Sequence, residues 1–254
     1  MSATLLDVRK GVATITLNRP ENRNALSVEL VNSLGDHLEA ALADPAVRLV
    51  VLTNNGTTFC AGADLKAGAV GQRTEGNRHF VEIFEMILQS DKPVIARVAG
   101  NAMAGGLGLA AACDISIMSA SGMLGFTEVR IGVAAAVISV VCLPKMRRAD
   151  ALDLFLTGER ISAARGVEVG LINYAVPDDE LDAKVDEIVG KVVRGGPIAL
   201  ARSKELVYRV PELRDRAEAF AWTGQLSAAL FASEEGQEGI ASFREKRDPS
   251  WIPR

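Results

Sequence analysis

Cysteine, histidine and aromatic side chains are scarce in this chain of 254 residues, which contains three Cys, two His and 5% aromatic residues. Cys60, Cys113 and Cys142 lie far apart and form no C-x-x-C pair, which argues against a zinc ribbon or a redox motif. Basic residues are not in excess, because 28 Lys and Arg stand against 32 Asp and Glu and leave a net charge of −4. Such a chain has no positive field to hold a nucleic acid, so we expect no nucleic-acid partner.

Targeting and membrane-spanning patterns are also lacking. Residues 1–10 show no basic stretch followed by an apolar one, so they predict no signal peptide. The most apolar stretch, 131–143, is too short to cross a bilayer. We therefore expect a cytoplasmic protein with no membrane partner. Its apolar content of 48% is sufficient for a hydrophobic core that needs no disulfide or metal ion for stability.

Several familiar catalytic patterns are missing as well. The sequence has no G-x-S-x-G nucleophile elbow and no G-x-x-x-x-G-K-[ST] phosphate loop, which disfavours a serine hydrolase and a P-loop NTPase. His37 and His79 have no Cys or carboxylate at metal-ligand spacing. We expect both histidines to be packed or solvated side chains, and we predict no metal site.

The chain does contain an alternation of strand and helix patterns up to about residue 145. β-Branched or alternating runs predict strands, and amphipathic spacing predicts the helices between them, which is typical of an α/β protein. The predicted strands are 12–17, 49–53, 93–98 and 115–118, and the predicted helices are 28–42, 80–88 and 107–112.

Helical patterns dominate the rest of the chain. One further strand is predicted at 171–176, and Gly195-Gly196-Pro197 is the clearest break. We predict two regions, a core of residues 1–195 and a helical region of residues 196–254. The predicted helices of this half are 149–156, 179–193, 197–208, 211–231 and 233–246.

Two strand-to-helix turns consist largely of residues with little or no side chain. One lies in 59–64, Phe-Cys-Ala-Gly-Ala-Asp, and the other in 99–108, Ala-Gly-Asn-Ala-Met-Ala-Gly-Gly-Leu-Gly. Such turns let a ligand approach the backbone and point free N–H groups at it. Tight helix–sheet packing explains either turn alone. The two together favour an oxyanion hole, in which two N–H groups converge on one carbonyl oxygen.

The second turn also fits a dinucleotide-binding pattern, G-x-G-x-x-[GA], at 106–111, with an acid, Glu128, about 20 residues further on. The helix that begins at these glycines would be short. Glu128 also does not lie at the end of the next predicted strand, where dinucleotide-binding folds carry their acidic residue. An NAD-dependent oxidoreductase is therefore a minor alternative.

Five motifs follow one another along the chain: NRP and RNALS within 18–27, FCAGADLK at 59–66, KPVIA, AGG and ACDI within 92–115, EVRIG at 128–132, and LTGERIS at 156–162. In this order they resemble the enoyl-CoA hydratase/isomerase (crotonase) family over about residues 5 to 247. The resemblance implies an α/β spiral of ββα units with a C-terminal helical trimerisation region, as a homotrimer or a dimer of trimers. It also implies an acyl-CoA substrate that carries its own coenzyme A, with no separate cofactor.

The resemblance further assigns roles to individual residues. Two backbone N–H groups hold the thioester oxygen in this family, and they correspond to those of Ala63 and Gly105. The positions that correspond to coenzyme A contacts are Arg23, Ala25, Ala61, Lys66, Phe243 and Lys246.

The catalytic carboxylates depart from the family pattern. Two-glutamate hydratases carry one glutamate where this chain has Glu128 and another where it has Gly108, and Ala136 stands where dienoyl isomerases carry an aspartate. Hydration of a 2-enoyl thioester needs a base for the water and an acid for the α-carbon, whereas moving a double bond from position 3 to position 2 needs one base that returns the proton at the γ-carbon. A lone Glu128 suits isomerisation, and hydration requires it to perform both tasks.

Segments 106–114 and 127–133 resemble most a bacterial branch of hydratases of the methylglutaconyl-CoA hydratase type, some of which also lack the first glutamate. We therefore rank hydration first, isomerisation second and a non-catalytic acyl-CoA binder third. The role of Glu128 depends on Arg130, because the two side chains would share a face in an extended segment. An ion pair would lower the carboxyl pKa, whereas burial without a cation would raise it.

Overall fold

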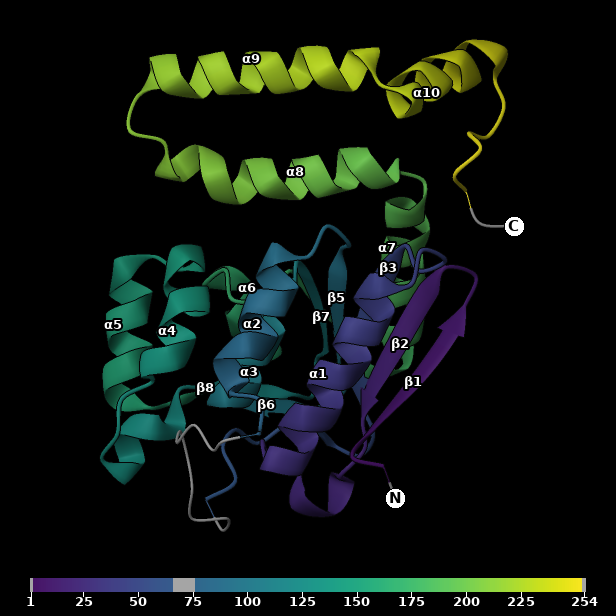
Figure 1. Cartoon of the computed structure of the whole chain (residues 1–254). Coiled ribbons are helices and arrows are strands. Elements are labelled where there is room, and N and C mark those ends of the chain that lie inside the picture. The colour runs from purple at the N-terminus through teal and green to yellow at the C-terminus, as the bar shows by residue number, and fades with distance from the viewer. Residues whose placement is uncertain (1, 66–75, 253–254) are drawn as a thin grey trace.

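The computed structural model describes residues 2–65 and 76–252, and it contains a large and a small β-sheet surrounded by helices (Figure 1). The strand order is β1-β2-β3-β5-β7-β10 in the large sheet and β4-β6-β8-β9 in the small one. The strands of the large sheet are β1 (Thr4–Arg9), β2 (Val12–Leu17), β3 (Leu49–Asn54), β5 (Val94–Val98), β7 (Ile115–Ser119) and β10 (Tyr174–Val176). Those of the small sheet are β4 (Thr58–Cys60), β6 (Asn101–Met103), β8 (Met123–Gly125) and β9 (Arg160–Ser162).

Consecutive strands alternate between the two sheets. The pairs β3 and β4, β5 and β6, and β7 and β8 each place one strand in the large sheet and the next in the small sheet, with parallel neighbours. A helix follows each pair: α2 (Phe80–Gln89), α3 (Gly105–Ala112) and, after a short 3-10 turn, α4 (Ala136–Cys142). This arrangement confirms the predicted α/β spiral of ββα units, and it stacks the turns that follow β4, β6 and β8 along one edge.

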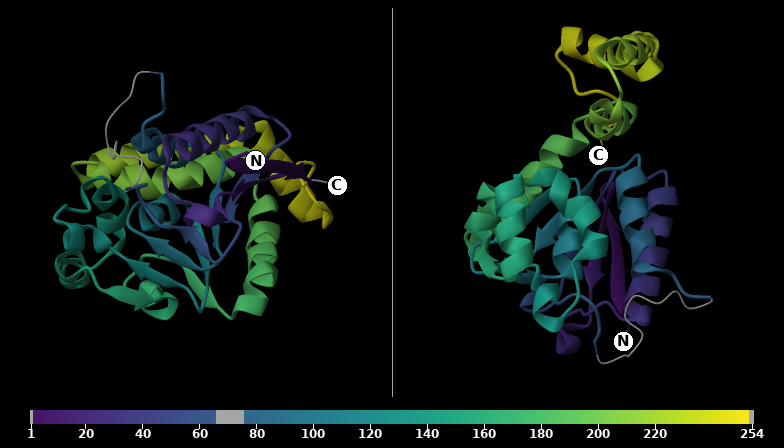
Figure 2. Two further views of the ribbon diagram at one scale, coloured as in Figure 1. Left: turned by 90° about the horizontal axis from the view of Figure 1, so that it is seen from below. Right: turned by 90° about the vertical axis from the view of Figure 1, so that its left-hand side faces the viewer.

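The central strand β3 is buried on both faces, which explains its continuous apolar sequence. Val50 and Leu52 belong to the core on the side of α1 (Val28–Ala43), while Leu49 and Val51 pack with residues of α7 (Leu181–Val193). Figure 2 shows these two helices on opposite sides of the sheet. The large sheet is thus a rigid middle layer that carries the small sheet and its turns.

The last three helices, α8 (Pro197–Arg209), α9 (Arg216–Ala232) and α10 (Glu234–Glu245), stand apart from the sheets (Figures 1 and 2). Lys204 of α8 ties them to the core, because its Nζ donates to Asp114 Oδ2 at 3.0 Å and to the carbonyl of Ile87 at 2.6 Å. Arg48 of the core donates to the carbonyl of Gly195 at 2.8 Å, just before α8 begins.

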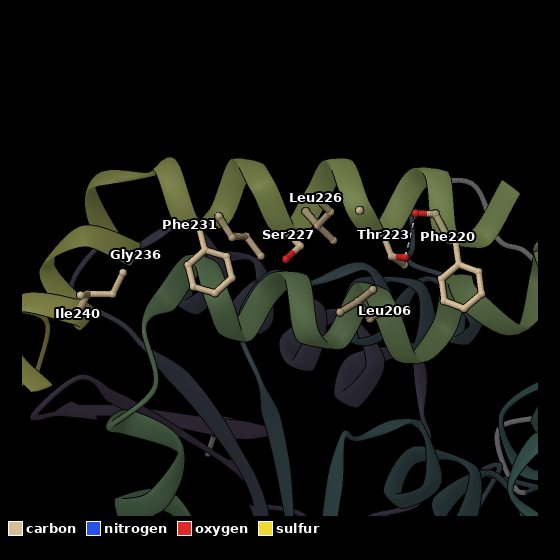
Figure 3. A pocket seen from close by; sticks show the side chains of 10 residues that line it. Leu206, Phe220, Thr223, Leu226, Ser227, Phe231, Gly236 and Ile240 are labelled. Atoms are coloured by element: carbon tan, nitrogen blue, oxygen red, sulfur yellow. Dashed lines mark hydrogen bonds between the residues drawn. The ribbon is translucent and has the colours of Figure 1, made fainter. Parts of the chain in front are cut away.

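An apolar groove of about 630 Å³ runs between α8 and α9 and reaches α10 (Figure 3). Phe220 and Phe231 project beside it and are 75% and 66% exposed. The groove is lined by Leu206, Phe220, Thr223, Gly224, Leu226, Ser227, Leu230, Phe231, Gly236 and Ile240.

The structure corrects three sequence expectations. All four strands of the small sheet were missed, because strands of three residues are too short to show a period. The strand expected at 171–176 is limited to Tyr174–Val176, since the N–H of Leu171 donates back to Gly166 in a loop. Residues 211–215 precede the helix that was expected to include them, because the side chain of Asp215 accepts a hydrogen bond from Glu218 and caps α9.

The remaining helices are α5 (Arg148–Thr157) and α6 (Ala163–Glu168). In the part of the chain that the structure describes, no helix has the length and apolar character needed to cross a membrane.

Candidate active site

The turn after β4 is fastened to the segment that precedes α1. The N–H of Ala61 donates to the carbonyl of Arg23 at 3.1 Å, and the N–H of Leu26 donates to the carbonyl of Gly62 at 2.8 Å. Gly62 adopts φ +89°, which favours glycine at this position. The turn therefore leads directly to Ala63, which forms a parallel bridge with Leu26.

The turn after β6 contains an unusual backbone conformation. Ala104 has φ 48° and ψ −124°, a region that costs a residue with a Cβ about 1–3 kcal/mol. Ala104 is the N-cap of α3, so Gly105 is the first helical residue and its N–H has no partner within the helix. The strain thus orients a free N–H group at the start of a helix, where the helix dipole also favours negative charge.

The two turns pack directly against each other. A Cβ atom built on Gly62 would lie 2.8 Å from the Cβ of Ala104 and 3.3 Å from the N of Gly105. Among residues 2–65 and 76–252, neither the N–H of Ala63 nor that of Gly105 donates a hydrogen bond. The arrangement offers two free backbone donors from adjacent turns, as an oxyanion hole requires.

Ala63 and Gly105 both line a cavity of about 850 Å³ that Glu128 also lines. Its walls are mostly apolar, and they combine the segment before α1, the start of α2, the start of α3 and the segment that leads into α4. The apolar side chains of the lining are Leu26, Val28, Leu65, Phe80, Ile131, Val133, Val137 and Ile138.

Glu128 lies on a 3-10 turn, Thr127–Ile131, that follows β8. Its Oε2 atom is buried and has no hydrogen-bond partner among the described residues. Burial raises the pKa of the Glu128 carboxyl above its ordinary value, and a backbone hydrogen bond opposes this only in part. A carboxyl whose pKa is raised is better suited to accept and return a proton than an ordinary exposed glutamate.

The segment around Glu128 is not extended, so the pairing with Arg130 that an extended strand would give is absent. Nε of Arg130 instead donates to the carbonyl of Gly158 at 2.9 Å. Within the described ranges, Glu128 forms no ion pair with Arg130 or with any other cation. Of the two alternatives that the sequence left open, the described residues therefore show burial without a cation.

Three of the residues predicted to contact coenzyme A lie together. The hydrogen bond from Ala61 to Arg23 places both beside Ala25, and the side chain of Arg23 is exposed there. Lys66 lies outside the described residues. Phe243 and Lys246 are on and just after α10, which Figure 1 shows at the opposite end of the molecule from β6 and β8, and neither lines the cavity.

Sequence reasoning missed several residues of the site. His79 lines the cavity and caps α2, because its Nδ1 accepts a hydrogen bond from the N–H of Val81 at 3.3 Å. Asn24 is fully buried with φ 52°, and its Nδ2 donates to the carbonyl of Thr58 at 2.8 Å. The pattern His-x-x-Glu before an apolar run, which is typical of a capping box, could have indicated His79. The tolerance of Asn for positive φ could have indicated Asn24.

The glycines of the dinucleotide-like pattern are packing positions. A Cβ on Gly106 would lie 2.2 Å from the carbonyl oxygen of Cys60, and one on Gly108 would lie 2.3 Å from Cγ2 of Ile138. Protein atoms occupy the space that a pyrophosphate would need, which argues against the NAD alternative.

In the described part of the chain, neither the cysteines nor the acidic residues indicate a reactive thiol or a metal site. Cys60 is buried, and burial raises the pKa of its thiol to about 12. Over the described residues, no group of three or more His, Cys, Asp or Glu side chains is placed to hold a metal ion.

Comparison with known proteins gives consistent matches over the whole chain. The family model described as enoyl-CoA hydratase/isomerase matches residues 7–254. Enoyl-CoA hydratase EchA19 from Mycobacterium tuberculosis is 32% identical over 257 residues, which cover 98% of this chain and 96% of that protein. The 2,3-dehydroadipyl-CoA hydratase of Escherichia coli is 30% identical, with 100% of each chain covered. The crystal structure of an enoyl-CoA hydratase from Mycobacterium smegmatis is similar with a TM-score of 0.88 and 33% identity, over 98% of each chain.

Proposed function

The chain belongs to the enoyl-CoA hydratase/isomerase family of enzymes, and from that premise we propose that it adds water to the double bond of a 2-enoyl-CoA thioester. One observation carries the proposal: Glu128, whose Oε2 atom has no hydrogen-bond partner among the described residues, lines the same cavity as Ala63 and Gly105, and within those residues neither of their N–H groups donates a hydrogen bond. The proton donor and acceptor and the oxyanion donors that the reaction needs are therefore present in one place.

In this mechanism the thioester oxygen accepts hydrogen bonds from the N–H groups of Ala63 and Gly105. Glu128 removes a proton from a water molecule while the water oxygen bonds to the β-carbon. The electrons of the double bond move toward the carbonyl oxygen, and the resulting enolate is held by the two N–H groups, each of which contributes about 3–4 kcal/mol. Glu128 then returns its proton to the α-carbon, so that one water is added and the carboxylate is regenerated.

A second candidate reaction is favoured by Gly108, which provides no carboxylate at the position where the family resemblance places the second glutamate of two-glutamate hydratases. Glu128 alone is sufficient to remove the α-proton of a 3-enoyl thioester and to return it at the γ-carbon. The relationship to the family favours hydration, whereas the sufficiency of one proton-transferring residue favours isomerisation. We place hydration first.

Incubation with matched 2-enoyl- and 3-enoyl-CoA esters separates these reactions. Hydration adds the mass of one water to the 2-enoyl ester, whereas isomerisation moves the double bond of the 3-enoyl ester at unchanged mass. Binding of both esters without turnover of either would refute the catalytic proposal and leave an acyl-CoA binder.

The class of acyl group follows from two further residues of the cavity. Arg130 and Arg160 line it, and over the described ranges neither guanidinium forms an ion pair with the protein. A carboxylate at the far end of the acyl chain would complement them, as in substrates of the methylglutaconyl-CoA type. We expect a lower KM for glutaconyl-CoA than for crotonyl-CoA, and we expect Arg160→Met to raise the KM for the acidic ester only.

We also propose that the C-terminal helices assemble the chain into a homotrimer or a dimer of trimers. The apolar groove beside Phe220 and Phe231 supports this, since a groove of that kind is rarely left open to water (Figure 3). Contact of Phe243 and Lys246 with coenzyme A would then come from a neighbouring copy. Light scattering tests the assembly, while the division at residue 195 and the cytoplasmic location stay predictions.

A further inference from the structure

Gly108 occupies the position from which a second carboxylate would enter the cavity. It lies one helical turn after Gly105, so the two residues share a face of α3. A Cβ on Gly105 would point at Leu26 and Phe80, which line the cavity, and a Cβ on Gly108 would point at Ile138, which also lines it.

Ile138 already fills the space in front of Gly108. A Cβ on Gly108 would lie 2.3 Å from Cγ2 and 2.7 Å from Cβ of Ile138, and 3.2 Å from Cζ of Phe84. Ile138 is 3% exposed and Phe84 is 4% exposed, so protein atoms surround most of each side chain.

The two clashing atoms of Ile138 are also the least mobile part of its side chain. Cβ is fixed by the backbone of α4, and a β-branched residue in a helix has one strongly preferred χ1 rotamer. A side chain at position 108 therefore requires either a shift of α4 away from α3 or the replacement of Ile138.

We infer that Gly108 and Ile138 form a steric pair, and that Ile138 keeps any side chain, a carboxylate included, out of position 108. Ile138 presents an apolar wall there, so α3 supplies no acid or base to the reaction. Glu128 then acts without a carboxylate from α3, and among the described residues Asp64 is the other acidic residue that lines the cavity. The catalytic consequence of this inference rests on the proposed function. The steric clash between positions 108 and 138 is independent of it.

The steric part is tested by thermal unfolding of G108A in three backgrounds. Alanine is a better helix former than glycine, so G108A stabilises a helix interior unless its methyl group clashes. We expect G108A to lower the unfolding midpoint of the otherwise native chain. It should lower the midpoint again in the I138V background, because valine keeps both clashing atoms. In the I138G background, which removes both atoms, G108A should raise the midpoint.

If G108A lowers the unfolding midpoint by the same amount in all three backgrounds, or raises it in the otherwise native chain, the proposed steric pair is overturned. This measurement uses no substrate, so it stands even if the proposed reaction fails.

The catalytic part is tested with G108E and its isostere G108Q. In the I138G background we expect G108E to raise kcat for hydration of a 2-enoyl-CoA ester at least tenfold, and we expect G108Q to give no such rise. In the I138V background neither substitution should raise it. An equal effect of G108E and G108Q in the I138G background would contradict the assignment of Ile138 as the residue that keeps a catalytic carboxylate out of position 108.

Discussion

Replacement of Glu128 by Gln is expected to change activity and stability in opposite directions. The substitution keeps the shape of the side chain but removes its ability to accept and return a proton. Proton transfer by a positioned side chain contributes about 10²–10⁴-fold, so we expect kcat to fall by that factor for both the 2-enoyl and the 3-enoyl ester.

The effect on stability follows from the burial of an unpartnered Oε2 atom. Burial raises the pKa of Glu128 in the folded state, so the stability that this group contributes is present below its unfolded pKa of about 4.3 and is lost as pH rises through the folded pKa. At pH 8 the ionised carboxylate is a cost of about 1.4 kcal/mol for each unit of pKa shift. The amide of Gln lacks a partner as well, and the site is only half-buried, so we expect E128Q to gain about 1 kcal/mol.

For a chain of this length such a gain corresponds to a rise of about 2–4 °C in Tm at pH 8. The difference from the native chain should shrink toward pH 4, where its Glu128 becomes protonated. The native enzyme should also lose kcat/KM on the acid side with a pKa above that of an ordinary glutamate. Glu180→Gln, at an exposed glutamate that does not line the cavity, is the matched control for activity and should leave kcat unchanged.

A lower Tm for E128Q at pH 8 would refute the electrostatic argument. Full turnover of both esters by E128Q would refute the catalytic one. The two readouts are independent, so each part of the reasoning fails separately.

Three other substitutions have expected outcomes. Ala104→Gly should stabilise the chain by about 1 kcal/mol in urea unfolding, because glycine adopts φ 48° without strain; a clear loss would contradict the strain. Lys204→Met should cost about 3 kcal/mol at pH 8, because the buried Asp114 loses its ion pair and keeps the hydrogen bond from the N–H of Val94, and the cost should fall at low pH as Asp114, whose pKa burial raises, is protonated. Phe231→Asp should reduce the particle mass seen by light scattering if the groove is an interface, and an unchanged mass would argue against it.

Local patterns in the sequence were sufficient for the parts of the fold that depend on neighbouring residues. β-Branched runs predicted the strands at 12–17 and 49–53 within a residue of β2 and β3, because period and side-chain shape act along the chain itself. The small residues of 59–64 and 99–108 predicted two backbone turns that carry free N–H groups, since only residues with little side chain allow such packing. Glu128 was identified as the candidate acid and base from the resemblance of its motif to the enoyl-CoA hydratase/isomerase family.

Other features depend on residues that are distant in the sequence. The strands of the small sheet have three residues each, and they exist only because neighbouring strands satisfy their hydrogen bonds. The pKa of Glu128 depends on the 3-10 turn that directs Arg130 to Gly158, which no periodicity predicts.

The sequence alone determined the longer strands of the large sheet, most of the helices and the residue types of the two turns, because those properties depend on short stretches of chain. The tertiary structure decided that Ala63, Gly105 and Glu128 share a cavity, that Phe243 and Lys246 lie away from it, and that Ile138 occupies the space in front of Gly108. These outcomes depend on packing between segments that are far apart along the chain, where excluded volume and burial act only after the segments meet.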